Sequence, residues 1–571
     1  MEQLKAAAVP AGFLRNAGGV WRATRGEDPM FVCGPLDVVA YVHNADGDIS
    51  GRLLAASGWD GVARRWVASS SDIFGRGVEL ASYLDGKRVH VSSGDAARRQ
   101  LSAYLTESRP SAYVRQVTQP GWHCGAYVTP SGDVLGNPDE LLFYDPPKAA
   151  KAHFAQSGTQ ESWQRNIARF GRGNPRLMFA ISSAFAGPLV GVAGVSSGGF
   201  NFYGSSSIGK TTLARAAVSV FGAPSYMQSC RATDNALEAV ASEHNDALLV
   251  LDEVGQMDAH AVGEVAYMLG NGEGKRRADR SGDAREARAW RLVFLMTGEV
   301  ALAQHMASAG KRVRAGQEVR MIDIDANAGQ GRGVFDELHG YKGGAELSAE
   351  IVDGARSNYG VAGRQFIEWI AADRDGICRR TSREIRKFVT ENTPDGADGQ
   401  VLRSLERFAL VGVAGELATE AGITGWPSGE SLEAASACFR SWLEDRGGSG
   451  SGEAAAILRQ VRAFFEAHGE SRFTNLDDAE SRPTINRAGY RKRVVAESGE
   501  PVSAVQHWVL PSVFERELCD GYSPKVVREV LRAHGWISID SGGKATKPQR
   551  IPGEARRMRV YVFTDAMWGG E

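Results

Sequence analysis

The sequence is short of cysteine and of net charge. Its 571 residues include six cysteines that lie far apart, and no two of them have C-x-x-C spacing. Neither a disulfide framework nor a zinc knuckle is expected from this pattern. Lysine plus arginine (66) and aspartate plus glutamate (68) nearly cancel, which leaves a formal net charge of −2. This balance excludes a uniformly basic nucleic-acid coat protein, although not a local basic patch.

The sequence shows neither a clear secretion signal nor an unbroken apolar segment of the kind that spans a membrane. The N-terminus lacks an apolar signal core, so the reducing cytoplasm is the expected location. Residues 177–209 carry no charge, and this length is sufficient for a membrane span. Glycines, serines and Pro188 interrupt the segment, and its end has the pattern of a strand that enters a glycine loop. We therefore expect a buried helix followed by a buried strand, and no contact with a membrane.

Composition and patterning divide the chain into five expected parts. Residues 1–148 are strand-rich and α+β, and are expected to form a collar for oligomerisation or for guiding DNA. Residues 149–345 alternate apolar strands with helices, which predicts a mainly parallel sheet covered on both faces. A helical lid or connector (346–446), a Gly/Ser linker (447–452) and a mixed C-terminal domain (453–571) follow. The strands of the central part are expected at 200–203, 247–251, 291–296 and 319–324.

A phosphate-binding loop is indicated early in the central part. The pattern G-x-x-x-x-G-K-[ST] is matched by Gly204, Ser205, Ser206, Ser207, Ile208, Gly209, Lys210, Thr211 and Thr212. Glycines let backbone N–H groups close around phosphate oxygens, and the helix that follows adds its positive N-terminal end. Lys210 is expected to reach the β- and γ-phosphates of ATP, and the Thr211 hydroxyl to ligate Mg²⁺. An apolar strand precedes the loop and a helical run follows it, as this motif requires.

Two later strands end in polar residues that suit an ATPase. The strand at 247–251 is followed by Asp252, expected to hold the metal through water, and Glu253, expected to polarise the attacking water as general base. The strand at 291–296 is followed by Thr297, our candidate for positioning that water, as in the AAA+ branch of P-loop ATPases. Taken singly, each strand end also fits an ordinary core strand with a solvated polar terminus.

Cations lie between and after these strands. A glycine-rich loop at 270–282 predicts either a solvated surface hairpin or, as we favour, a loop that tracks DNA phosphates. The cations of this loop are Lys275, Arg276, Arg277 and Arg280. In a ring ATPase a neighbouring subunit supplies an arginine to the γ-phosphate, and our candidates are Arg320 first and Arg314 second. Either arginine would otherwise pair with a surface carboxylate.

The C-terminal region is locally basic. Between residues 523 and 560, nine lysines and arginines stand against three acids, a local charge of +6. A helix at 523–534 with Pro524 in its first turn, a Gly/Lys/Arg-rich loop and a strand at 559–563 suggest a winged-helix-like module that faces nucleic acid. A basic protein-docking domain is the alternative, because no base-reading residues can be picked out.

Taken in order, several stretches resemble the family called domain of unknown function nine-two-seven, found in replication helicases of phages, plasmids and pathogenicity islands. The stretches lie at 121–123, 200–212, 231–238, 244–246, 269–275, 297–299 and 315–320. They include Gly121-Trp122-His123 and His244-Asn245-Asp246, for which the residues alone suggest no role. The resemblance covers roughly residues 30–340 and implies an AAA+ motor that assembles as a hexameric ring around DNA and unwinds forks.

The leading interpretation is an ATP-dependent DNA helicase of a mobile element, with ATP and Mg²⁺ as cofactors and with DNA and further copies of itself as partners. A primase or initiator of the same element is expected as a further partner. A nucleotide-switched DNA-binding initiator or regulator that does not unwind DNA is the first alternative. A protein-remodelling AAA+ ATPase is the second, although such machines would carry an apolar aromatic pore loop where this chain has cations. A small-molecule kinase fits least, since no acceptor pocket can be traced.

Overall fold

The computed structural model divides the chain into two units, described here one at a time. The first comprises Met1–Thr393 and Arg403–Trp442, and the second Pro394–Leu402 and Leu443–Glu571. The residues that the structure describes are 4–26, 28–75, 77–275, 277–278, 284–285, 287–311, 315–450, 452–478, 484–495, 501–540, 542–552 and 556–569.

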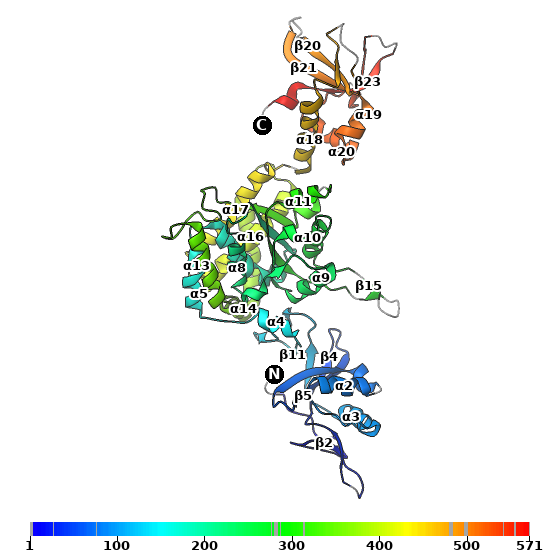
Figure 1. The fold of residues 1–571 in the computed structure, drawn as a ribbon, viewed down its shortest axis with the longest axis vertical. Coiled ribbons are helices and arrows are strands. Elements are labelled where there is room, and N and C mark those ends of the chain that lie inside the picture. Colours follow the sequence, from blue (N-terminus) through cyan, green and yellow to red (C-terminus); the bar gives the residue numbers. More distant parts are fainter. Residues whose placement is uncertain are drawn as a thin grey trace. The chain divides into compact units, whose positions relative to one another are not determined.

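The first unit begins with small sheets and three helices (Figure 1). Three strands pair in the order β1-β2-β3, namely β1 (Phe13–Asn16), β2 (Gly19–Arg22) and β3 (Met30–Cys33). A five-stranded sheet has the order β11-β7-β4-β5-β6, with bounds Leu142–Phe143, Tyr113–Gln116, Asp37–His43, Ile49–Ser57 and Ala63–Ser69. The helices are α1 (Ser70–Phe74), α2 (Val78–Gly86) and α3 (Asp95–Glu107). Their apolar residues share one core with β3, β4, β5 and β6, so the predicted α+β character of this region is confirmed.

A small antiparallel sheet lies between this region and the central part in the chain. Its strands pair in the order β10-β9-β8, with bounds Val134–Leu135, Ala126–Val128 and Gly121–His123. A Pro-Ser-Gly-Asp turn joins β9 and β10, and Gly132 in that turn has φ +96°, a conformation that favours glycine.

The central part of the first unit is a parallel five-stranded sheet (Figure 1). Its order is β13-β14-β17-β12-β18, with bounds Gln228–Ser229, Ala247–Asp252, Leu292–Gly298, Gly198–Tyr203 and Met321–Asp325. All four neighbouring pairs are parallel, so the carboxyl ends of the strands share one edge of the sheet. The four strands expected from the sequence are confirmed, and β13 is a short edge strand that the apolar pattern did not reveal.

Helices cover both faces of this sheet, because its strands are apolar on both sides. On one face lie α6 (Pro175–Ala186), α8 (Lys210–Val218) and α16 (Gly399–Glu420). On the other lie α9 (Asp234–Glu243), α10 (Val262–Asn271) and α11 (Leu302–Ser308). The stretch Pro175–Ala193 is long and apolar enough to cross a membrane, but 83% of its most apolar window is buried inside the protein. The expected buried helix followed by a buried strand is therefore confirmed as α6 and β12.

The chain then becomes helical, as predicted for the region after residue 345. The helices are α13 (Gly344–Ser357), α14 (Val361–Ala372), α15 (Arg374–Asn392), α16 and α17 (Glu430–Arg446). Phe408 of α16 packs on Phe179 of α6 and on Phe200 of β12, with ring centroids 5.4 and 5.2 Å apart. The helical region thus contributes directly to the core beneath the central sheet.

The second unit contains a five-stranded sheet in the order β19-β20-β21-β23-β22. The strand bounds are Phe473–Asn475, Gly489–Val495, Pro501–Val509, Met558–Phe563 and Thr546–Gln549. Its helices include α18 (Gly452–His468), α19 (Pro511–Val513) and α20 (Pro524–Ala533). The predicted helix and closing strand are present as α20 and β23. The structure adds β19, β20, β21 and α18. The two strands after α20, β22 and β23, therefore belong to a five-stranded sheet, which is larger than the short hairpin expected for a wing.

Candidate nucleotide-binding site

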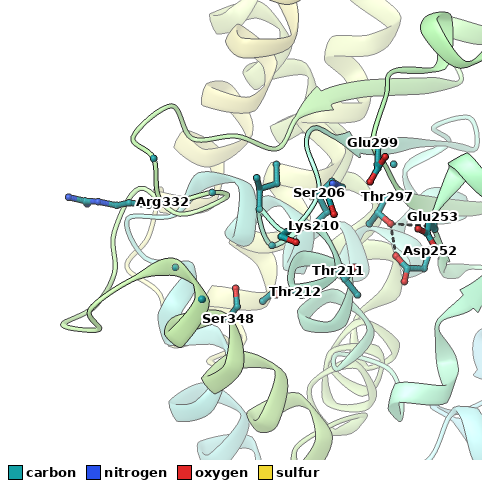
Figure 2. Close-up of a pocket in the computed structure, with 18 residues that line it drawn as sticks. Ser206, Lys210, Thr211, Thr212, Asp252, Glu253, Thr297, Glu299, Arg332 and Ser348 are labelled. Atoms are coloured by element: carbon teal, nitrogen blue, oxygen red, sulfur yellow. Dashed lines mark hydrogen bonds between the residues drawn. The ribbon is translucent and has the colours of Figure 1, made fainter.

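A cavity of about 670 Å³ opens at the carboxyl edge of the central sheet (Figure 2). This volume is within the usual range for sites that bind small molecules. Its walls are residues 206–212, the ends of β14 and β17, the loop 331–333 and the first turns of α13. Parallel α/β sheets bind ligands outside the carboxyl ends of their strands, where successive connections run in opposite directions. Here β12 meets that condition, since β17 and β18 flank it.

The loop between β12 and α8 has the backbone that its glycines predict. Gly204 has φ +147° and Gly209 φ +105°, conformations that side chains disfavour. A Cβ atom on Gly209 would also lie 2.9 Å from Val334 Cγ2. The Lys210 ammonium donates to the carbonyl oxygens of Gly204 and Ser205, at 2.8 and 2.6 Å. The Lys210 side chain therefore folds back across the start of its own loop.

The acids and Thr297 meet across neighbouring strands. Thr297 Oγ1, at the end of β17, donates to Asp252 Oδ1 at 2.5 Å and accepts from the Glu253 N–H at 3.0 Å (Figure 2). Glu253 has φ +69°, a left-handed conformation that is unusual for a non-glycine residue. The carboxylate of Glu253 also accepts a hydrogen bond from Gln256. The threonine thus fixes the backbone of one acid and the carboxylate of the other.

The charges in the cavity are mixed in sign. Burial lowers the pKa of the Lys210 ammonium from its usual value, while Glu299, Asp252 and Glu253 act in the opposite direction. One cation therefore faces three carboxylates across the cavity. The three acids thus offset part of the effect of burial on the pKa of Lys210.

The residues present fit a nucleoside triphosphate with a divalent cation. The glycine turns leave no room for a side chain where phosphates would approach, and Lys210 supplies the positive charge. Thr211 and Asp252 both line the cavity and offer the oxygen ligands that Mg²⁺ prefers. The sequence-derived residues Ser206, Ser207, Ile208, Gly209 and Thr212 line the same cavity. Their roles remain predictions.

Three polar side chains of the cavity wall were missed by the sequence analysis. Glu299 follows Thr297 by two residues, so the strand end itself was a usable signal. Arg332 lies in a Gly-Arg-Gly loop, and its side chain points away from Lys210 and the acids (Figure 2). Ser348 lies on α13 across from Thr212 (Figure 2). The same wall also contains Gly331, Gly333, Gly344 and Ala345, which add no large side chain to the cavity. No single motif marks this wall, since it comes from two separate segments.

The predicted arginine of a neighbouring subunit lies away from this cavity. Arg320 precedes β18, so it is at the amino edge of the sheet. Its guanidinium donates to Asn271 Oδ1 and to the Gly316 carbonyl, both at 2.8 Å, and lies 4.3 Å from the centre of the Tyr267 ring. Arg320 does not line the cavity of its own subunit, and its action in a neighbouring subunit stays a prediction. Arg314 lies outside the described residues.

The predicted DNA loop is a β-hairpin at its described positions. Strand β15 (Arg277–Ala278) pairs antiparallel with β16 (Ala284–Arg285). At the base of the hairpin, Lys275 Nζ forms an exposed ion pair with Asp234 at 2.7 Å. Of the other predicted cations, Arg277 lies in β15, whereas Arg276 and Arg280 lie outside the described residues. A hairpin agrees with both interpretations of the loop.

The two motif stretches without an assigned role contact each other at the amino edge of the sheet. Asp246, which precedes β14, accepts from the Trp122 N–H at 3.0 Å and from Arg291 at 2.9 and 2.7 Å. Asn245 donates to the Pro120 carbonyl at 2.8 Å. Gly121 has φ +107°, and a Cβ atom there would lie 2.4 Å from the Asn245 amide. Hydrogen bonds thus connect the β8–β9 hairpin to the starts of β14 and β17, the strands that end in the acids and in Thr297.

Comparison with known proteins agrees with these features. The sequence profile of the family described as Domain of unknown function (DUF927) matches residues 15–289. Over that range the chain matches this family, as its motifs predicted.

Among solved structures, one described as "SCCmec type IV Cch - active helicase" matches with a TM-score of 0.69 and 16% identity, over 97% of each chain. At this identity the likeness shows a shared fold. The apo structure of the NrS-1 C-terminal region matches with a TM-score of 0.25 and 10% identity, over 63% of this chain and 75% of that chain. That score is too low to support an argument. The comparison with curated proteins finds no match.

Proposed function

We propose that the protein is an ATP-dependent DNA helicase or translocase of the AAA+ class, acting as a ring in the replication of a phage, plasmid or genomic island. The observation that carries the proposal is the cavity in which Lys210, the two acids and Thr297 converge. The position of β17 between β12 and β14 supports the AAA+ assignment, since it delivers Thr297 between the phosphate loop and the acids. The fold shared with a helicase supports the DNA-directed part.

The residues of the cavity have distinct proposed roles. Lys210 moves from the loop carbonyls to the β- and γ-phosphates, and the N–H groups at 207–212 bind the remaining phosphate oxygens. Glu253 accepts a proton from the water that attacks the γ-phosphate, and Thr297 holds the Glu253 backbone in place. When bound, Mg²⁺ supplies positive charge to the phosphates, and Thr211 and Asp252 are the residues that would hold it. A neighbour's Arg320, or Arg314, stabilises the charge of the transferring phosphoryl group.

Movement on DNA is assigned to the cationic hairpin. Hydrolysis around a ring changes the position of each hairpin, and Lys275, Arg276, Arg277 and Arg280 follow the phosphates of one strand. The basic C-terminal domain acts as a winged-helix-like contact to nucleic acid, and the N-terminal region as a guide or collar. These proposed roles are assigned to parts of the chain that we expected from the sequence.

Unwinding of a forked DNA substrate with ATP tests the proposal. We expect strand displacement by the wild type, and loss of both displacement and ATP hydrolysis by Lys210→Ala with an unchanged thermal unfolding midpoint. Forks with either tail removed identify the strand that is followed. ATP hydrolysis without displacement, and without stimulation by single strands, would instead identify a nucleotide-switched initiator or regulator.

Replacement of Arg276 and Arg277 by alanine tests the hairpin. Since their charges serve DNA and not ATP, DNA-stimulated hydrolysis should fall by about tenfold while basal hydrolysis stays near that of the wild type. Equal loss of both rates would assign the hairpin a structural or intersubunit role.

A further inference from the structure

A stack of three side chains crosses the N-terminal five-stranded sheet. The register places Tyr41 of β4 beside Tyr113 of β7 on one side and beside Arg52 of β5 on the other. The two tyrosine rings are stacked, with centroids 5.2 Å apart and planes 25° apart. The Arg52 guanidinium lies 4.4 Å from the centre of the Tyr41 ring. The order is therefore Tyr113, Tyr41, Arg52, in a single continuous stack.

The outer end of this stack is open to solvent. Tyr113 is 58% exposed, although its ring already packs on Tyr41. The next strand, β11, pairs with β7 at Arg115 and Gln116. Among the described strands none lies beside Tyr113 on that side. One aromatic face is thus presented to solvent, held flat by the ring behind it.

The inner end of the stack is a buried cation without an acidic partner. Arg52 is 9% exposed, donates to the Gly51 carbonyl at 3.2 Å, and leaves its Nε without a hydrogen-bond partner. Within the described residues, no salt bridge joins Arg52 to a carboxylate. Burial lowers the pKa of the Arg52 guanidinium, and the nearby exposed Arg109 lowers it further. Two cations without a compensating acid favour an anion at this place.

The neighbouring acid is already neutralised. Glu140 pairs with Arg115 at 2.7 Å and with His43 at 3.2 Å. It therefore does not offset Arg52 and Arg109. An open aromatic face on a stack that ends in an arginine, with the exposed Arg109 four residues before Tyr113 in the chain, is a combination that suits unpaired nucleotides, because every base has a π-face and every nucleotide carries a phosphate.

We propose that Tyr113, Tyr41, Arg52 and Arg109 form a binding site for single-stranded nucleic acid, separate from the hairpin of the ATPase core. An unpaired base stacks on the exposed face of Tyr113, and a backbone phosphate pairs with Arg109 while Arg52 holds the stack from behind. Because the site binds through base stacking and phosphate charge, it has little preference among base sequences.

The test is the affinity of the full chain for a fluorescent oligo(dT) without nucleotide, followed by anisotropy. Tyr113→Ala should raise Kd about tenfold, and Tyr113→Phe should stay close to the wild type because stacking is retained. Arg109→Ala should lower the slope of log Kd against log salt concentration by about 0.7. Phe74→Ala is the matched control, since Phe74 is an exposed aromatic of the same region (67%) that is not part of the stack.

Unchanged oligo(dT) affinity in Tyr113→Ala would overturn the proposal, as would an equal loss in Phe74→Ala or in Tyr113→Phe. Equal weakening of duplex binding would also overturn it, because paired bases cannot stack on Tyr113. The measurement uses no ATP, so it is independent of the proposed function. A chain that hydrolyses no ATP but shows the Tyr113 effect would retain this site and lose the helicase assignment.

Discussion

The two edges of the central sheet use polar side chains in opposite ways. At the carboxyl edge, Lys210, Asp252, Glu253 and Glu299 surround an open cavity. At the amino edge, the buried Asp246 carboxylate receives bonds from Arg291, Asn245 and the Trp122 N–H. The same two strands, β14 and β17, connect both edges. The charges at the carboxyl edge are the ones to which we assign catalysis, whereas the paired charges at the amino edge hold the starts of the same two strands.

The largest expected effect is at the carboxyl edge. Glu253→Gln keeps the shape of the side chain but removes the carboxylate that we propose as the base, so ATP turnover should fall by roughly 10²–10³-fold. Nucleotide affinity and the thermal unfolding midpoint should remain near those of the wild type. Steady-state hydrolysis, fluorescent-nucleotide titration and calorimetry measure the three quantities. Near-normal turnover would show that Glu253 is not the base.

At the amino edge the expected effect is on stability. Asp246→Ala leaves Arg291 and the Trp122 N–H without their buried acceptor, so the free energy of unfolding should fall by about 3 kcal/mol. Denaturant unfolding checks this. Asp234→Ala is the control, because its pair with Lys275 is exposed and should be worth less than about 1 kcal/mol. Similar losses in the two variants would contradict the contrast between the edges.

His244, also at the amino edge, predicts a pH dependence. The buried ring contacts the Val240 carbonyl at 2.7 Å, and burial lowers the pKa of His244 to about 4. The unfolded chain binds the proton near pH 6.5, so stability is present above that pH and is lost as pH falls toward 4, by roughly 3 kcal/mol in all.

Unfolding measured from pH 7.5 to 4.5 should show a flatter profile for His244→Gln than for the wild type. His507, in the second unit, has its pKa lowered to about 4 as well, so His507→Gln serves as the companion variant. An unchanged profile in His244→Gln would mean that the ring already binds a proton in the fold.

The smallest effect concerns the hairpin bound to this edge. Trp122 Nε1 donates to the Pro188 carbonyl at 2.8 Å. Trp122→Phe keeps a ring but leaves that carbonyl unpaired, which should cost about 1–2 kcal/mol in unfolding free energy without changing ATP turnover. Trp59→Phe, at a 64% exposed position, should cost close to nothing. A change in turnover with Trp122→Phe would show that the amino edge influences the chemistry.

Local patterns predicted the half of the site that is contiguous in the chain. The candidate phosphate loop occupies nine consecutive residues, and the acids and Thr297 directly follow apolar strands. The spacing of the loop motif and the apolar pattern of the strands were therefore sufficient to predict these residues. The wall formed by Arg332 and Ser348 was not predictable, because a loop and a helix after the last strand return to the cavity only in the folded chain. In the second unit the sequence predicted only the helix α20 and the strand β23, and the other four strands of the sheet were missed.

The sequence by itself determined the candidate phosphate loop, the alternation of strands and helices and the resemblance to the matched family, because each depends on residues close together in the chain. Only the tertiary structure decided that the Thr297 hydroxyl bridges both acids and that Trp122 meets Asp246 across 124 residues. It also decided that Tyr113, Tyr41 and Arg52 form one stack. The reason is physical: hydrogen bonds and ring stacking depend on distances that strand pairing sets, and a linear pattern does not contain those distances.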